Sequence, residues 1–191
     1  MATTLLIGLG NPGKEHAKDR HNAGFMAIDK IAEDWHFPPF KKAFGGAFAD
    51  GVIEGNKLYL FKPMSYMNRS GGPASEVSNF YKIEPDHIIV IHDELDLGLG
   101  KLRVKKGGGH GGHNGLRDLD RHLGKDYLRV RFGIDHPGDK DAVSDYVLSS
   151  FAKAETPTVD IMISEISRHI SLLLKGDEAE FMNKITLATS A

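Results

Sequence analysis

The sequence predicts an α/β fold, a single domain in which helices flank a mixed β-sheet. Strand-like apolar runs alternate along the chain with segments of helical periodicity. Some neighbouring strand-like runs are close enough to pair as hairpins, which predicts a mixed sheet. The chain has 191 residues, 40% of them hydrophobic, and no internal repeat or linker-like stretch. We therefore expect residues 1–191 to form one domain.

The strand-like runs are short, rich in β-branched or aromatic residues and bounded by turn residues. They cover residues 3–8, 47–53, 57–63, 87–91, 101–105 and 128–134.

The helical segments show apolar residues at intervals of three and four. One face of residues 21–35 carries Phe25, Ile28, Ala32 and Trp35, and Pro73 is expected to open a second helix. A third helix carries Leu116, Leu119 and Leu123 after a glycine-rich loop. A fourth is expected to begin with Thr156 as N-cap and Pro157 at N1 and to end at Lys175-Gly176.

Composition narrows the class of protein. The chain has no cysteine, no apolar run that could span a bilayer and no basic leader with a cleavage site. We expect a cytoplasmic protein. The net charge of −2 argues against a generic nucleic-acid binder, but residues 101–131 hold nine basic and three acidic side chains. This basic segment flanks the glycine-rich loop "GGGHGGHNG", which favours an anionic ligand there over a merely solvated face.

Polar side chains follow three of the expected strands. Asn11 follows the first strand, Asn68 follows residues 57–63, and His92 and Asp93 follow residues 87–91. Ligands of open α/β sheets bind outside the carboxyl ends of the strands. If these strands are parallel neighbours, Asn11, Asn68 and Asp93 converge on one crevice.

The string "GLGNPG" fits the G-x-G-x-x-G dinucleotide fingerprint only literally. That fingerprint needs a helix to open at the loop and an acidic residue at the end of a second strand. Asn11-Pro12-Gly13 instead predicts a turn, and the acidic residues about 20 positions on, Glu33 and Asp34, fall inside a helical stripe. We reject a dinucleotide site.

A metal site is the stronger rival. His92, His110 and His113 are ligand types, as are Glu165 and His169 at helical spacing. No H-E-x-x-H motif is present, so we expect no metal and no cofactor. A serine nucleophile has no G-x-S-x-G support either. These exclusions leave an activated water as the nucleophile, with a histidine as the base. His21 is the best candidate among the ten histidines, because it follows the Asn11 turn at the start of a helix, and Asp93 is the carboxylate expected to orient its ring.

Six motifs resemble the bacterial-type peptidyl-tRNA hydrolases in order and spacing. They are "IGLGNPG", "RHNAG", "KPMSYMNRSG", "HDELDL", "GGGHGGHNGL" and "HPGD". The resemblance runs to about Phe151. It implies a twisted mixed sheet and metal-free cleavage of the ester between a peptide and the tRNA ribose.

The resemblance also implies roles for residues of this chain. His21 is the general base, Asp93 supports it, and Asn11 matches the asparagine that separates N-blocked from free aminoacyl-tRNA. The positions expected to contact the tRNA end or the peptide are Tyr66, Met67, Asn68, His113 and Asn114. Lys105 and Arg131 match basic positions near the tRNA 5′-phosphate. His16 stands where the family commonly has a tyrosine that lines the crevice.

Two other classes stay open at this point, a metal-dependent hydrolase using His92, His110 and His113 and a non-catalytic RNA-binding module. For the favoured class we expect peptidyl-tRNA as the partner, no membrane and no obligate protein partner. The chain is then expected to be a monomer.

Overall fold

A computed structural model describes residues 3–190, and its centre is a seven-stranded sheet in the order β2-β3-β4-β1-β5-β7-β6. The strands are β1 (Thr4–Gly8), β2 (Lys41–Ala43), β3 (Gly46–Ile53), β4 (Asn56–Pro63), β5 (Ile88–Glu94), β6 (Leu102–Lys106) and β7 (Leu128–Gly133). Strands β4, β1, β5 and β7 run parallel, while β2–β3, β3–β4 and β6–β7 pair antiparallel. The predicted mixed sheet flanked by helices is confirmed.

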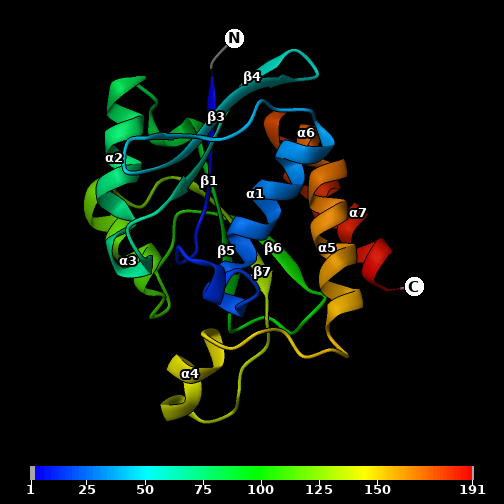
Figure 1. Ribbon diagram of the computed structural model, residues 1–191. Coiled ribbons are helices and arrows are strands. Elements are labelled where there is room, and N and C mark those ends of the chain that lie inside the picture. The colour runs from blue at the N-terminus through cyan, green and yellow to red at the C-terminus, as the bar shows by residue number, and fades with distance from the viewer. Residues whose placement is uncertain (1–2, 191) are drawn as a thin grey trace.

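Helices cover both faces of this sheet (Figure 1). On one face lie α1 (Ala23–Asp34), α5 (Thr156–Arg168), α6 (Ile170–Leu174) and α7 (Glu178–Thr189), and on the other lie α2 (Gly71–Phe80) and α3 (Asn114–Leu123). A short helix, α4 (Val143–Val147), stands apart at the carboxyl ends of the parallel strands.

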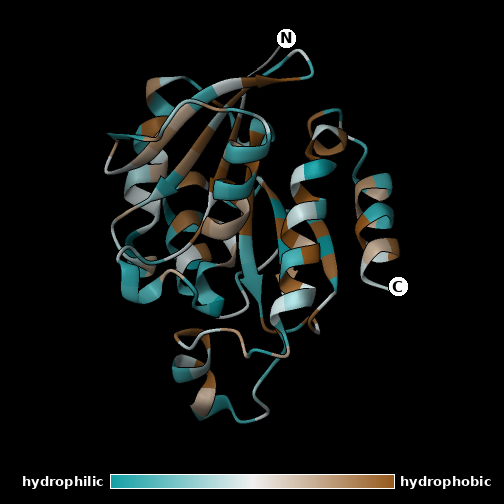
Figure 2. Cartoon of the chain, turned by 45° about the vertical axis from the view of Figure 1, so that its right-hand side comes forward, coloured by the Kyte–Doolittle hydropathy of each residue, from teal (hydrophilic) through white to brown (hydrophobic). Residues whose placement is uncertain are grey.

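Two apolar clusters form the core, one on each face of the sheet. Leu6, Ile28 and Ile166 belong to the cluster under α1 and α5, and Ile7, Val77 and Leu119 to the cluster under α2 and α3. The strand side chains alternate between the two clusters, as the period of two requires. Figure 2 shows hydrophobic residues along the central strands and mixed faces on the helices. No helix between residues 3 and 190 is long and apolar enough to cross a membrane.

All six predicted strands are confirmed to within about three residues at each end, and three expectations for the helices need correction. Helix α2 begins at Gly71, so Pro73 is its third residue; proline is tolerated there because first-turn N–H groups have no helical partner. Helix α5 begins at Thr156 with Glu155 as N-cap and ends at Arg168. The expected continuation to residue 175 is a separate helix, α6, because the backbone leaves the helical conformation at His169.

A close crossing of α1 over the sheet fixes the start of that helix. A Cβ atom at Gly24 would collide with the carbonyl oxygen of Ile91 and, at 2.5 Å, with the amide nitrogen of Leu9. A Cβ atom at Gly8 would collide with the carbonyl oxygen of Gly24. Only glycine permits this approach, which places residues 20–22 directly above the end of β5.

We predict that Gly24→Ala lowers the free energy of unfolding by about 1–3 kcal/mol or more, because backbone atoms cannot yield as side chains do. Gly72→Ala is the matched control, since a Cβ atom there meets nothing within 4 Å. Its stability should stay equal or rise by up to about 1 kcal/mol, as expected for glycine replaced in a helix. Urea unfolding measures both, and equal values for the two variants would contradict the close crossing.

Candidate active site

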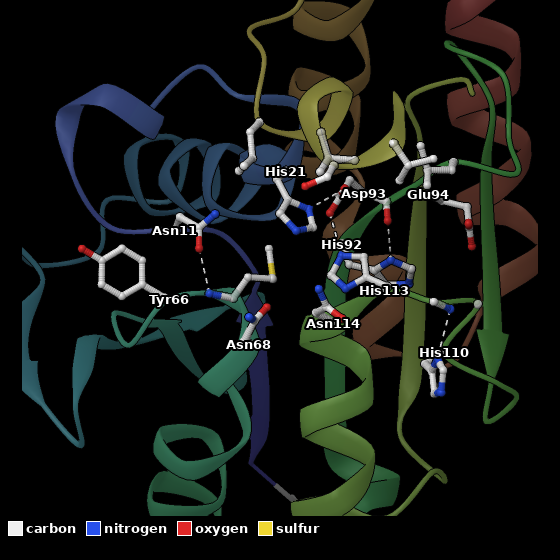
Figure 3. A pocket seen from close by; sticks show the side chains of 18 of the residues that line it. Asn11, His21, Tyr66, Asn68, His92, Asp93, Glu94, His110, His113 and Asn114 are labelled. Carbon is white, nitrogen blue, oxygen red and sulfur yellow. Dashed lines mark hydrogen bonds and ion pairs between the residues drawn. The ribbon is translucent and has the colours of Figure 1, made fainter. Parts of the chain in front are cut away.

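A crevice of about 610 Å³ opens at the carboxyl ends of β1, β4 and β5. Among the residues that line it are nine of those expected from the sequence: Asn11, His16, His21, Tyr66, Met67, Asn68, Asp93, His113 and Asn114. Figure 3 shows several of these side chains converging from separate elements on one space. The other two expected residues, Lys105 and Arg131, line a neighbouring cavity of about 210 Å³.

The carboxylate of Asp93 joins two histidines at the centre of the crevice. Its Oδ2 accepts a hydrogen bond from His21 Nδ1 at 2.8 Å, and its Oδ1 accepts one from His113 Nε2 at 2.7 Å. Asp93 is only 3% exposed, and the rings of His21 and His113 lie 4.9 Å apart. The expected contact between His21 and Asp93 is therefore present, and His113 adds a second one.

Each member of this cluster comes from a different layer. Asp93 lies near the end of β5, His21 lies in a 3-10 turn (Arg20–Asn22) just before α1, and His113 precedes α3. His113, rather than Asn114, is the N-cap of α3, because its Nδ1 accepts a hydrogen bond from the amide of Leu116 at 3.3 Å. That bond assigns the proton of His113 to Nε2, the nitrogen that faces Asp93.

The charges of the cluster follow from these contacts. Burial pushes the pKa of Asp93 up, but His21 and His113 outweigh it and hold that pKa well below its ordinary value. Burial pulls the pKa of His21 down, while the charge and hydrogen bond of Asp93, with help from Asp19, raise it overall above 6.5. Because an ionised carboxylate only accepts hydrogen bonds, His21 donates through Nδ1. Its Nε2 is then free to take a proton.

His92 neighbours this cluster without joining it. Its Nδ1 donates to the carbonyl oxygen of Asp93 at 2.8 Å, and its ring meets that of His113 edge-on at 5.3 Å. Burial, followed by the electrostatic effect of the neighbouring His113, lowers the pKa of His92 to about 4, so this ring is neutral near pH 7.

Asn11 is held by contacts that leave its NH₂ group available. Its Oδ1 accepts a hydrogen bond from the amide of Met67 at 2.7 Å, and its backbone exchanges two bonds of 2.9 Å with the side chain of Asn22. Met67 is buried under the crevice. Asn22 is not among the site residues predicted from the sequence, although its place next to His21 in "RHNAG" is a signal.

Asn68, Asn114 and Tyr66 form the more open rim. The side chains of both asparagines are exposed, and Asn114 Oδ1 accepts a bond from Arg117 at 3.2 Å. Tyr66 has a φ of 64° and its side chain is 60% exposed. The glycine-rich wall beside them uses left-handed backbone at Gly107, Gly108, Gly111 and Gly112, which explains its composition.

One wall of the crevice comes from residues that the sequence did not predict. Val143, Val147 and Leu148, in and after α4, give it an apolar side. Arg20 ties this wall down: its guanidinium donates to Ser149 Oγ at 2.5 Å and to the carbonyl oxygen of Ser150 at 2.9 Å, and lies 4.1 Å from the ring centre of Tyr146. No periodic pattern marks a five-residue helix, so the sequence carried no usable signal.

His16 forms a second histidine–carboxylate pair in the crevice. Its Nδ1 donates to Asp19 Oδ2 at 2.7 Å. Asp19 is buried, whereas a quarter of the His16 side chain is exposed.

The alternative metal set does not assemble. Within residues 3–190, the cluster whose ligand atoms lie within 4.8 Å of one another is His21, Asp93 and His113. His110 instead accepts a bond from the amide of Gly112, and His169 pairs with Glu165 on α5. In the His21–Asp93–His113 cluster the histidine nitrogens share protons with Asp93, and a cation would have to replace both of these hydrogen bonds.

Some arginines of the basic segment, residues 101–131, are held in the structure by ion pairs, and some basic residues line the smaller cavity. Arg129 is 2% exposed, pairs with Asp120 at 3.0 Å and donates to the carbonyl oxygens of Gly108 and Gly109. Arg131 pairs with Glu94 through Nε at 2.8 Å, which lowers the pKa of Glu94 against the effect of its burial. Lys105 and Arg131 both line the smaller cavity.

Comparisons with known proteins agree with this geometry. The family model described as peptidyl-tRNA hydrolase matches residues 5–191. The peptidyl-tRNA hydrolase of Rhodospirillum centenum is 50% identical, covering 97% of this chain and 82% of its own, and that of Dinoroseobacter shibae is 52% identical, covering 97% and 79%. The crystal structure of the Acinetobacter baumannii peptidyl-tRNA hydrolase is 44% identical, with a TM-score of 0.91 over 96% of this chain and 94% of that one. The chain therefore belongs to the peptidyl-tRNA hydrolase family.

Proposed function

We propose that this chain hydrolyses the ester between a peptide and the ribose of tRNA, with His21 activating the attacking water and without a metal. The observation that carries the proposal is the 2.8 Å hydrogen bond between His21 and the buried Asp93 in the crevice. It leaves Nε2 of His21 as an acceptor toward a space that a peptidyl ester can enter (Figure 3).

In the first step, Nε2 of His21 takes a proton from water while the oxygen of that water attacks the ester carbonyl carbon. Asp93 stabilises the imidazolium that forms, because its charge is fixed and close. His113 holds the second oxygen of Asp93 and so limits its rotation. General-base assistance of this kind contributes about 10²–10⁴ in rate.

The carboxamides supply the donors that the tetrahedral intermediate needs. Asn11 has its oxygen engaged by Met67, so its NH₂ group is the part left for the substrate. Asn68 and Asn114 reach the crevice from its exposed rim. Donors aimed at a developing oxyanion contribute about 10²–10³ in rate each, and we assign this role to the three asparagines together.

The same donors support discrimination between substrates. A site built to hydrogen-bond the amide of an N-blocked amino acid leaves its own polar groups unpaired when a charged amine replaces that amide. Asn11 is the fixed member of the set, since two contacts to Asn22 and one to Met67 hold it. We therefore assign recognition of the blocked amino group to Asn11.

Binding of the tRNA backbone is assigned to the smaller cavity. Lys105 and Arg131 line it, and Glu94 aims the guanidinium of Arg131 by engaging Nε alone. The two outer nitrogens then form the planar fork that suits a phosphate. His16, Tyr66 and Met67 are assigned to the tRNA end or the peptide in the main crevice.

We further propose that residues 1–191 act as one domain and as a monomer. We place the enzyme in the cytoplasm, the compartment in which translation supplies its substrate. The absence of cysteine fits a reducing compartment.

The deciding experiment measures release of labelled N-acetyl-aminoacyl groups from tRNA by the purified chain in excess EDTA. We expect turnover to persist, and His21→Ala to lower kcat by about 10² or more with little change in KM, because the base acts in the transition state. Loss of activity in EDTA, restored by a divalent cation, would instead favour a metal on His21, Asp93 and His113. Binding of tRNA without any release would favour a non-catalytic RNA-binding module.

A pH profile tests the pairing of His21 with Asp93. The base works when neutral, so activity should fall as the pH drops through the raised pKa of His21, with a midpoint above 6.5. Asp93→Asn removes the raising charge and leaves burial, which lowers the pKa, so the midpoint should move below 6.5. The plateau rate should fall by about 10²–10⁴ as well.

Glu94→Gln is the control for this profile, because Glu94 lies next to Asp93 but pairs with Arg131. Its midpoint should match that of the unaltered chain. A midpoint that stays in place in Asp93→Asn would refute the electrostatic coupling.

Salt dependence tests the assignment of Lys105. We expect Lys105→Gln to make the slope of log KM against log salt concentration shallower by about 0.7–0.9, the value for one phosphate contact. Lys106→Gln is the neighbouring control, since Lys106 pairs with Asp86 at 2.9 Å on the outer surface. Equal slopes in the two variants would mean that Lys105 does not contact phosphate.

A further inference from the structure

The crevice contains a second histidine–carboxylate pair whose geometry repeats that of His21 and Asp93. His16 Nδ1 lies 2.7 Å from Asp19 Oδ2, and His21 Nδ1 lies 2.8 Å from Asp93 Oδ2. In both pairs the carboxylate is buried, with exposed side-chain fractions of 4% for Asp19 and 2% for Asp93. In both pairs the histidine lines the crevice.

The backbone holds the His16–Asp19 pair in place. The amide of Asp19 donates to the carbonyl oxygen of His16 at 3.0 Å, and the carbonyl oxygen of Asp19 accepts from the amide of Asn22 at 2.9 Å. The backbone of Asp19 also forms an isolated antiparallel β-bridge with that of Ser150. The imidazole of His16 is therefore not a free surface group, although a quarter of its side chain reaches solvent.

The two pairs are electrostatic neighbours. The charge of Asp19 contributes to the raised pKa of His21. Asp19 thus hydrogen-bonds to His16 and is close enough to His21 to raise its pKa. The ring nitrogen of His16 that faces Asp19 is Nδ1, so this contact does not engage Nε2, and His16 lines the crevice.

We infer that His16, held by Asp19, is the general acid that protonates the departing ribose oxygen. The inference rests on the proposed function. A ribose alkoxide is a poor leaving group, so its oxygen needs a proton as the bond breaks, and histidine is the side chain that most often supplies one. The carboxamides around the crevice donate hydrogen bonds but no proton.

When the tetrahedral intermediate collapses, the bond between the carbonyl carbon and the ribose oxygen breaks and its electron pair stays on that oxygen. The Nε2 proton of the His16 imidazolium moves to the same oxygen, and Asp19 keeps the proton on Nδ1. His21 ends the reaction protonated and His16 neutral, so one proton passes through solvent from His21 to His16 before the next turnover. The net change is one water added across one ester.

This division of labour separates two tasks that one histidine would otherwise perform in turn. With His21 alone, the imidazolium would have to turn from the attacking water to the leaving oxygen. With His16 as the acid, base and acid are two separate side chains of the same crevice.

The test compares two esters of the same N-acetyl amino acid with the purified full-length chain. The adenosine 3′-ester needs a proton on its leaving oxygen, whereas the 4-nitrophenyl ester leaves as a stable anion. We expect His16→Ala to lower kcat/KM by about 10² on the adenosine ester and on peptidyl-tRNA. On the nitrophenyl ester the loss should stay below roughly threefold.

Three further variants make the comparison decisive. Asp19→Asn should repeat the selective loss at smaller size, and its thermal unfolding alongside that of His16→Ala establishes that both variants are folded. His110→Ala removes a crevice histidine without a carboxylate partner and should leave the ratio of the two esters unchanged. His21→Ala should lower turnover of both esters, which tests the proposed function separately. Equal losses on both esters in His16→Ala and Asp19→Asn would overturn the assignment of His16.

Discussion

The buried carboxylate of Asp93 is the interaction on which the site depends. It accepts hydrogen bonds from His21 on the α1 side of the sheet and from His113 on the α3 side. Removing a carboxylate from water is costly unless donors replace its hydration. Two histidine donors do so here, and they also join the helical layers at the end of β5. The same carboxylate therefore determines the electrostatics of the site and connects the two helical layers.

The fold brings these groups together by two simple rules. Parallel strands end at the same edge, so the loops after β1 and β4 and the end of β5 share one crevice. The crossing at Gly8 and Gly24 then lets α1 lie close enough for His21 to reach Asp93. The glycine-rich loop before α3 adopts left-handed backbone conformations at several glycines. This loop leads to His113, which hydrogen-bonds to Oδ1 of Asp93.

Much of this could be predicted from the sequence, and the failures have identifiable reasons. Strand runs and polar residues after them are local signals, so the sheet and the convergence of Asn11, Asn68 and Asp93 were predictable. The break at His169 was not, because the buried stripe of Ile166, Ile170 and Leu173 continues across it. Strand β2 and helix α4 are too short to show a period. A partner such as Asp19 depends on side-chain directions that spacing does not reveal.

The attachment of the α4 wall has a consequence for how a long nascent chain fits. Backbone and guanidinium bonds from Arg20 hold Ser149 and Ser150, directly after the apolar residues Val147 and Leu148. Because Arg20 is the neighbour of His21, these bonds link the wall directly to the segment that carries the base. The width of the slot is thus set before any polypeptide arrives, and little ordering entropy is lost when one is captured.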